Sequence, residues 1–158
     1  MPILVLGLGN LLMTDDALGG RVIETLERKF EFPEQVALID GGTLGLDLLP
    51  RLEGIDKLLV IDALEMDAEP GTVFRLVGDE VPRAFASKLS VHQMGLQDLL
   101  AVAELQGHLP EELIIWGAQV ASIEMGTQLS EAMAPALEQI VAAVVQELAG
   151  WGASPRAA

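Results

Sequence analysis

Short apolar runs that alternate with helical patterns constrain the fold of this chain most strongly. Four runs are dominated by apolar side chains, as strands are when helices cover both faces of a parallel sheet. They are Pro2–Leu8, Val36–Ile39, Lys57–Asp62 and Glu112–Gly117. A fifth run, Thr72–Leu76, alternates apolar and polar residues and therefore predicts an edge strand, for which an antiparallel direction is suitable.

Helical periodicity fills the stretches between these runs. Apolar residues recur every four positions on one face of a predicted helix from about Asp15 to Lys29. A second pattern predicts a closing helix over Met133–Leu148. A weaker one predicts a short helix near Leu48 that must either start late or kink at Pro50. Strands that alternate with helices predict the α/β class: a single doubly wound domain, with a mostly parallel twisted sheet of about five strands flanked by helices.

Composition limits the class of protein. The chain has 158 residues, which is the size of a single domain. A domain of this size buries roughly two thirds of the surface that its unfolded form would expose. We expect one domain over residues 1–150, followed by a frayed tail over residues 151–158. Although 51% of the residues are hydrophobic, the apolar runs are shorter than the about 18 residues of a membrane span, and no secretory signal pattern precedes Ile3. We therefore expect a cytoplasmic protein with no membrane partner.

Charge and cysteine content exclude further kinds of site. The chain has no cysteine, so any metal must be held by oxygen and imidazole ligands. Its formal net charge is −15, and Lys and Arg are absent between Lys88 and Arg156. That distribution leaves no basic track for a phosphate backbone, so nucleic acid is not expected as a partner.

Acidic residues follow the apolar runs where strands are predicted to end. The first run enters a glycine turn, Gly7-Leu8-Gly9-Asn10, and Asp15 and Asp16 come shortly after it, whereas Asp40 and Asp62 close the next two runs. In an open parallel sheet, ligands bind outside the carboxyl ends of the strands, so these acids should converge at one edge. Each acid also has a simpler structural role open to it, because acids complement the dipole at a helix start and cap turns.

His92 is the candidate imidazole. Ser90-Val91-His92-Gln93 has the form of a capping box, so a helix is predicted to begin there with His92 in its first turn. The helix dipole at that end disfavours the imidazolium, which leaves the ring neutral and able to bind a metal ion. His108 lies in a predicted loop, and we assign it no role.

Three kinds of site compete for the first loop. A dinucleotide site is disfavoured because the third glycine of its fingerprint is absent and because Asp15 and Asp16 would repel a pyrophosphate. A phosphoacceptor receiver domain, which is a signalling module, would use Asp15, Asp16 and Asp62, but the stretch after Trp116 lacks the cation that it needs. A metal site made by Asp16, Asp62 and His92 would hold a borderline divalent ion and leave coordination positions open.

Taken together, these motifs resemble the nickel-iron hydrogenase maturation endopeptidases. The resemblance rests on Gly7–Leu12 with Asp15-Asp16, on Asp40-Gly41-Gly42-Thr43, on Asp62-Ala63 and on Ser90-Val91-His92-Gln93, and it runs from Ile3 to about Leu148. It implies a cytoplasmic, usually monomeric protease. The substrate that it implies is the hydrogenase large-subunit precursor, from which a short C-terminal peptide is removed once nickel has been inserted.

The resemblance also implies roles for individual residues. Asp16, Asp62 and His92 match the metal ligands of the family and are the expected catalytic set, while Asp40-Gly41-Gly42-Thr43 matches a turn tied to substrate recognition or cleavage. The expected cofactor is nickel, supplied by the substrate. It would polarise the scissile carbonyl or activate a water molecule, and an acid–base role for Asp16 or Asp62, as in an aspartyl-type peptidase, stays open. Many members of the family carry Glu where this chain has Asp16.

Overall fold

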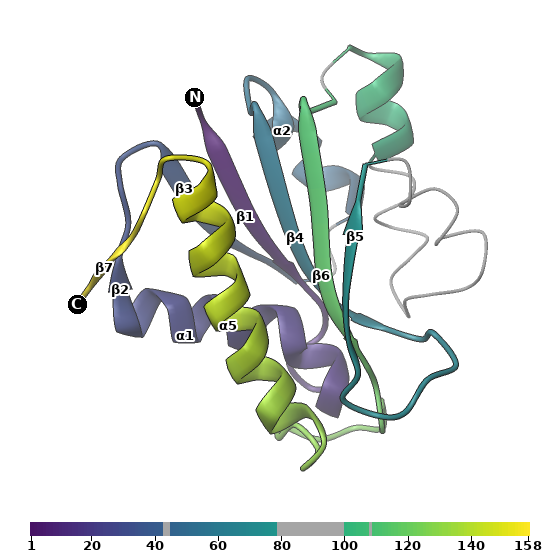
Figure 1. Ribbon diagram of the computed structural model, residues 1–158. Helices are drawn as coiled ribbons and strands as arrows, with labels where there is room; N and C mark the ends of the chain where they lie inside the picture. The colour runs from purple at the N-terminus through teal and green to yellow at the C-terminus, as the bar shows by residue number, and fades with distance from the viewer. Residues whose placement is uncertain (43–44, 79–99, 108) are drawn as a thin grey trace.

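A five-stranded sheet forms the centre of the molecule. The computed structural model describes residues 1–42, 45–78, 100–107 and 109–158. The sheet contains β1 (Ile3–Leu8), β3 (Val36–Gly42), β4 (Lys57–Leu64), β5 (Val73–Val77) and β6 (Glu112–Gln119), in the order β3-β1-β4-β6-β5. β1 pairs in parallel with β3 and β4, β4 pairs in parallel with β6, and β5 is antiparallel to β6 (Figure 1). The predicted mostly parallel sheet with an antiparallel edge strand is therefore confirmed.

Helices cover both faces of the sheet. The helical elements are α1 (Leu18–Lys29), η2 (Gly45–Leu48), α2 (Leu49–Leu52) and α5 (Met133–Gly150), and residues 100–105 are also helical. Alternate residues of β1 enter the two cores, because side chains of a strand point to opposite faces. Ile3 and Val5 pack in the cluster that contains α1 and α5, whereas Leu4 and Leu6 pack in the cluster that contains α2 and Leu100. This double burial explains why the first run carries no polar residue.

The start of the first helix differs from the prediction. α1 begins at Leu18, and Asp15 and Asp16 lie in a preceding 3-10 helix, η1 (Thr14–Ala17), rather than in an α-helical first turn. The N–H of Asp15 donates to the carbonyl oxygen of Ser122 (3.0 Å), so a loop distant in sequence sets the path of this turn. Of the two alternatives for the short helix, a late start or a kink at Pro50, the structure shows the late start: α2 begins at Leu49, and Pro50 lies in its first turn, where an N–H has no partner within the helix.

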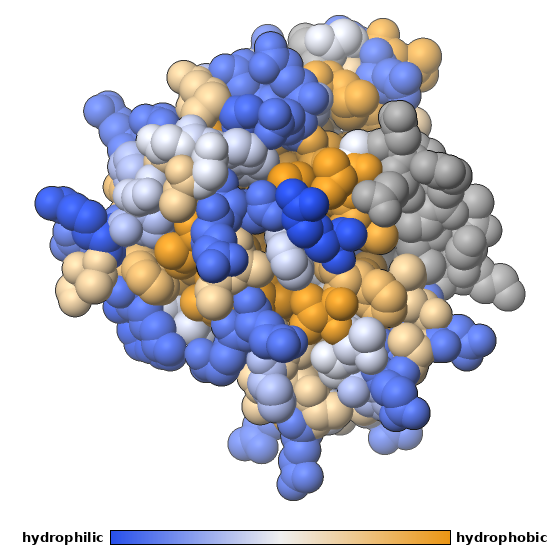
Figure 2. Space-filling view, in the orientation of Figure 1, coloured by the Kyte–Doolittle hydropathy of each residue, from blue (hydrophilic) through white to orange (hydrophobic). Residues whose placement is uncertain are grey.

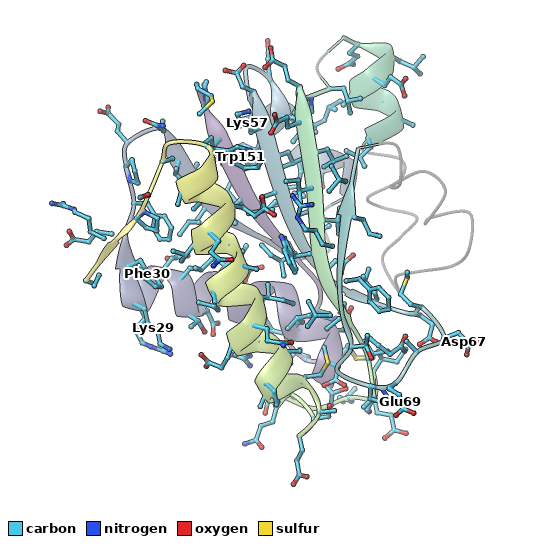
Figure 3. The ribbon with its side chains drawn as sticks, viewed as in Figure 1. Lys29, Phe30, Lys57, Asp67, Glu69 and Trp151 are labelled. Carbon is cyan, nitrogen blue, oxygen red and sulfur yellow. The ribbon has the colours of Figure 1, made fainter. Side chains whose placement is uncertain are left out.

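The end of the chain is attached to the domain, so the prediction of a frayed tail is wrong. β7 (Arg156–Ala157) pairs antiparallel with β2 (Phe30–Glu31), and the N–H of Ala158 donates to the carbonyl oxygen of Lys29 (2.9 Å). Figure 3 labels Lys29 and Phe30 beside this C-terminal strand. A strand of two residues is too short to produce a periodic pattern, which is why the sequence did not indicate it.

The order of the strands reverses beside β1. From β1 the chain moves to β3 on one side and then crosses to β4 on the other side. A reversal of this kind is a topological switch point, and it leaves room for a ligand outside the carboxyl ends of the two strands. In Figure 1 these ends lie at the bottom of the sheet, where the loop after β6 also runs. The helix predicted to begin at Ser90 starts outside the described residues.

The surface of the described part of the chain is mixed in polarity. On the face seen in Figure 2, hydrophilic side chains spread over most of the surface, and apolar side chains show between them. Within the described ranges, no helix is both long and apolar enough to cross a membrane.

Close contact between the backbones of β1 and α1 makes Gly19 a test of the fold. A Cβ atom at Gly19 would lie 2.3 Å from the oxygen of Leu8 and 2.6 Å from the oxygen of Ile61, and neither backbone atom can move aside. We expect Gly19→Ala to lower the free energy of unfolding by about 3 kcal/mol or more, because the core would be overpacked. Denaturant unfolding measures this change. Gly150→Ala is the control: a Cβ there meets nothing within 4 Å, so stability should be unchanged or slightly raised. Equal stability of the two variants would contradict the packing described.

Candidate active site

The carboxyl edge of the sheet gathers three of the predicted acids. Gly7 of β1 is in register with Asp40 of β3 and with Ile61 of β4, so Asp40 and Asp62 lie at nearly the same level of the sheet. Both acids lie inside their strands rather than after them, because β3 continues to Gly42 and β4 continues to Leu64, so the predicted strand ends are two residues too early. Asp16 reaches this edge from η1, which packs against β4. The structure thus places η1, which carries Asp16, against β4, which carries Asp62, while their joint role in a site stays a prediction.

The glycine turn after β1 wraps closely around Asp16. The Asp16 side chain is buried, and its Oδ2 accepts a hydrogen bond from the N–H of Asn10 (3.0 Å). Gly9 has φ +131°, and a Cβ atom at this position would lie 1.8 Å from the backbone oxygen of Asp16. Only glycine can adopt this backbone and leave that space free. The Oδ1 of Asn10 accepts from the N–H of Leu12 (2.9 Å), which confirms that Asn10 bridges the turn.

Asp62 is buried within the sheet itself. Its side chain is 0% exposed, and its strand neighbour in β6 is Gly117. A Cβ atom at Gly117 would lie 2.5 Å from the backbone oxygen of Asp62, so β4 and β6 approach closely here. Burial of a carboxylate costs free energy unless hydrogen bonds or a cation compensate for it, and carboxylate oxygens are common ligands of divalent cations.

The third predicted ligand, His92, lies outside the described residues, so its place in the site stays a prediction. Within ranges 1–42, 45–78, 100–107 and 109–158, no three His, Asp or Glu side chains form a group that could hold a metal ion. Asp16 and Asp62 therefore do not complete a three-ligand metal site with another described residue. His108 also lies outside these ranges.

Asp15 has a structural role that differs from that of its neighbour. It is 0% exposed, and its carboxylate accepts from the N–H groups of Ala121 (2.8 Å), Ser122 (3.0 Å) and Ser130 (2.7 Å) and from the Ser130 hydroxyl (2.9 Å). These donors lie at least 106 residues away in sequence, so no local pattern could have indicated them. Asp15 fastens the loop after β6 to the loop after β1.

Asp40 lies at the same edge of the sheet, opposite Gly7. It is exposed, and its Oδ1 accepts from the N–H of Gly42 (3.1 Å), which is the turn-capping role left open by the sequence. A Cβ atom at Gly20 would lie 3.1 Å from Oδ2 of Asp40 and 2.8 Å from Leu11, so Asp40 sits over the start of α1. The N–H of Gly9 donates to the oxygen of Gly42 (2.9 Å) and joins the two loops. Thr43 lies outside the described residues, and the recognition role of residues 40–43 stays a prediction.

Gln119 is a buried polar residue at this edge that the sequence analysis did not select. Its Oε1 accepts from the N–H groups of Met66 (2.7 Å) and Ala68 (3.3 Å), and its Nε2 donates to Glu65 (2.6 Å). The amide thus holds the loop after β4, on which Figure 3 labels Asp67 and Glu69. A polar residue at the end of an otherwise apolar strand was the signal that could have indicated it.

Comparison with known proteins identifies the family. A family model described as hydrogenase maturation protease matches residues 20–147. The hydrogenase 2 maturation protease of Escherichia coli is 42% identical over 163 aligned residues, which cover 100% of this chain and 98% of that protein. This chain belongs to the hydrogenase maturation proteases. It is a hydrolase that acts as an endopeptidase, so the receiver-domain alternative is wrong.

Solved structures support the same assignment for the fold. The hydrogenase maturating endopeptidase HybD from E. coli matches with a TM-score of 0.94 and 36% identity, over 99% of this chain and 98% of that chain. A [NiFe] hydrogenase maturation protease, HybD from Thermococcus kodakarensis, matches with a TM-score of 0.79 and 26% identity, over 92% and 98% of the two chains. The α/β fold predicted for this protease is that of its relatives.

Replacement of Asp15 tests how strongly the two loops of this protease depend on one carboxylate. Asn keeps the size of Asp but places an NH₂ group among four donors, so at least one of them loses its acceptor. We expect Asp15→Asn to lower the free energy of unfolding by about 3 kcal/mol. Asp67→Asn, the same change on an exposed loop, should stay within about 0.5 kcal/mol of the wild type. Thermal and urea unfolding measure both values, and a neutral effect at Asp15 would refute its structural role.

Proposed function

We propose that this protease removes the C-terminal peptide of the nickel-iron hydrogenase large-subunit precursor after nickel insertion, and that it recognises the nickel already bound in the precursor. The observation that supports this proposal most is the burial of two carboxylates, Asp16 and Asp62, at the switch point of the sheet. In the proposal, His92 adds an imidazole to them.

The chemistry of this donor set suits nickel. Two carboxylate oxygens and one imidazole nitrogen form a mixed set that borderline divalent ions accept, and the chain has no cysteine that would favour a softer ion. Three protein ligands leave coordination positions for groups of the precursor. The site would therefore hold a metal that arrives with its substrate.

A neighbouring backbone group fixes the Asp16 carboxylate, and the sheet buries the Asp62 carboxylate. The N–H of Asn10 fixes one oxygen of Asp16, and the glycine turn at Gly9 limits the space around it. Asp62 is 0% exposed, so solvent does not reach its side chain in the free protein. Bound nickel supplies Lewis-acid polarisation of the scissile carbonyl or of a water molecule, and either carboxylate can take part in proton transfer.

In this proposal the protease acts as a monomer, and it acts in the cytoplasm. The formal net charge of −15 supports the monomer, because copies of the chain repel one another. The proposed partner is the large-subunit precursor, and Asp40-Gly41-Gly42-Thr43 is proposed to contact the segment that is cut.

Cleavage of the precursor with and without nickel tests this proposal. Purified protease is incubated with nickel-loaded or nickel-free precursor, and the released peptide is measured by mass spectrometry. We expect release from the loaded precursor only. Equal release from both precursors would exclude recognition of nickel.

The two histidines provide a matched pair of variants for the same assay, because the chain has only two. His92→Ala should lower cleavage of the loaded precursor by at least about 100-fold, since one of three ligands is lost, while the unfolding midpoint stays close to that of the wild type. His108→Ala should cleave as the wild type does. Full activity of His92→Ala would remove His92 from the site.

A further inference from the structure

Exposed apolar side chains are concentrated beside the candidate site. Three of the large hydrophobic residues that the structure leaves exposed belong to the two loops next to Asp16: Leu12 is 61% exposed, Ile123 is 40% exposed and Met125 is 86% exposed. We call these three residues the apolar rim. Exposed apolar side chains that cluster on a surface mark sites of interaction.

Hydrogen bonds between the two loops hold the apolar rim in place. The N–H of Gly126 donates to the oxygen of Leu12 (2.8 Å), and the N–H of Thr14 donates to the oxygen of Gly126 (2.9 Å). The Thr14 hydroxyl lies within hydrogen-bond distance of the carbonyl oxygens of Ser122 (2.8 Å) and Glu124 (2.9 Å). Ile123 and Met125 therefore each lie next to residues that are tied to the loop after β1.

The backbone at the contact between the loops after β1 and β6 has an unfavourable conformation that many hydrogen bonds hold in place. Thr14 has φ +46°, a left-handed backbone that a β-branched residue rarely adopts unless its surroundings impose it. Asp15 anchors the same loop at Ala121, Ser122 and Ser130, and Arg21 donates to the oxygen of Thr127 (2.9 Å). Polar bonds hold the loop, which leaves the side chains of the apolar rim available for a partner.

We propose that the apolar rim binds apolar side chains of the precursor next to its scissile bond, an inference that rests on the proposed function. Leu12 precedes Asp16 by only four residues, and the N–H of Asp16 donates to the oxygen of Met13 (3.1 Å). An extended peptide advances about 3.3 Å per residue, so residues that flank a bond held near Asp16 must pass over the neighbouring loops.

A peptide suits the apolar rim better than a second copy of this chain. Three side chains expose on the order of a few hundred Å². Stable interfaces between proteins bury about 1,200 Å² or more, so the apolar rim alone is too small for a dimer. The net charge of −15 also opposes association of two copies, whereas a peptide that is already held at the site needs only a small additional contact.

Steady-state cleavage of nickel-loaded precursor tests the apolar rim. We expect the double variant Leu12→Gln and Met125→Gln to raise KM about tenfold and to leave kcat within about twofold, because binding is lost while the groups that act on the peptide bond remain. Each single variant should show part of this effect, and Met125→Leu should keep the KM of the wild type.

Leu105→Gln is the matched control. Leu105 is 87% exposed, nearly the same as Met125, and it belongs to helical residues 100–105, which Figure 1 places toward the opposite end of the sheet. We expect its KM to equal that of the wild type. The unfolding midpoints of all variants should agree within about 2 °C, since surface substitutions of this kind change stability little.

Three outcomes would overturn the proposal: an unchanged KM in the double variant, an equal rise in the control, or a wild-type dimer in sedimentation that the double variant abolishes. The last outcome would assign the apolar rim to contacts between copies. A parallel assay with nickel-free precursor separates this inference from the proposed function. If nickel-free precursor stays uncut while the double variant keeps the wild-type KM for nickel-loaded precursor, the binding role of the apolar rim is refuted and the proposed function is not.

Discussion

Two adjacent buried carboxylates, Asp15 and Asp16, provide the interaction on which the rest of the site depends. Asp15 accepts hydrogen bonds from the loop after β6, and Asp16 accepts one from the glycine turn after β1. Neighbouring residues of a 3-10 turn can point their side chains in different directions, so Asp15 contacts the loop after β6 while Asp16 contacts the glycine turn. The bonds of the Asp15 carboxylate, together with those of Thr14 to the same loop, hold η1 in the conformation that places Asp16.

The site is built by convergence from separate parts of the chain. The register of β1 with β3 and β4 sets Asp40 and Asp62 at one edge, and the close approach of Gly19 to β1 and β4 brings the start of α1 to the same edge. Gln119 then holds the loop after β4. The close approach at Gly19 is between backbone atoms, which explains the glycine there, whereas the loop after β4 is held by a side-chain amide.

The sequence predicted the fold and that Asp40 and Asp62 lie on neighbouring parts of one sheet, but it ended their strands two residues too early. Particular residues show which features a sequence pattern can predict. Double burial of β1 leaves a continuous apolar run, and parallel strands must end at one edge, so both features follow from local patterns. The bonds of Asp15 to Ala121 and Ser130, the amide contacts of Gln119, and the pairing of β7 with β2 join residues far apart in sequence. A periodic pattern holds no information about such partners.

Nickel K-edge X-ray absorption of the freeze-quenched complex between the protease and nickel-loaded precursor tests the central claim most directly. The account predicts that the nickel gains oxygen and imidazole ligands when the protease binds, and that His92→Ala removes the imidazole contribution. A nickel spectrum that is identical before and after complex formation would contradict the account.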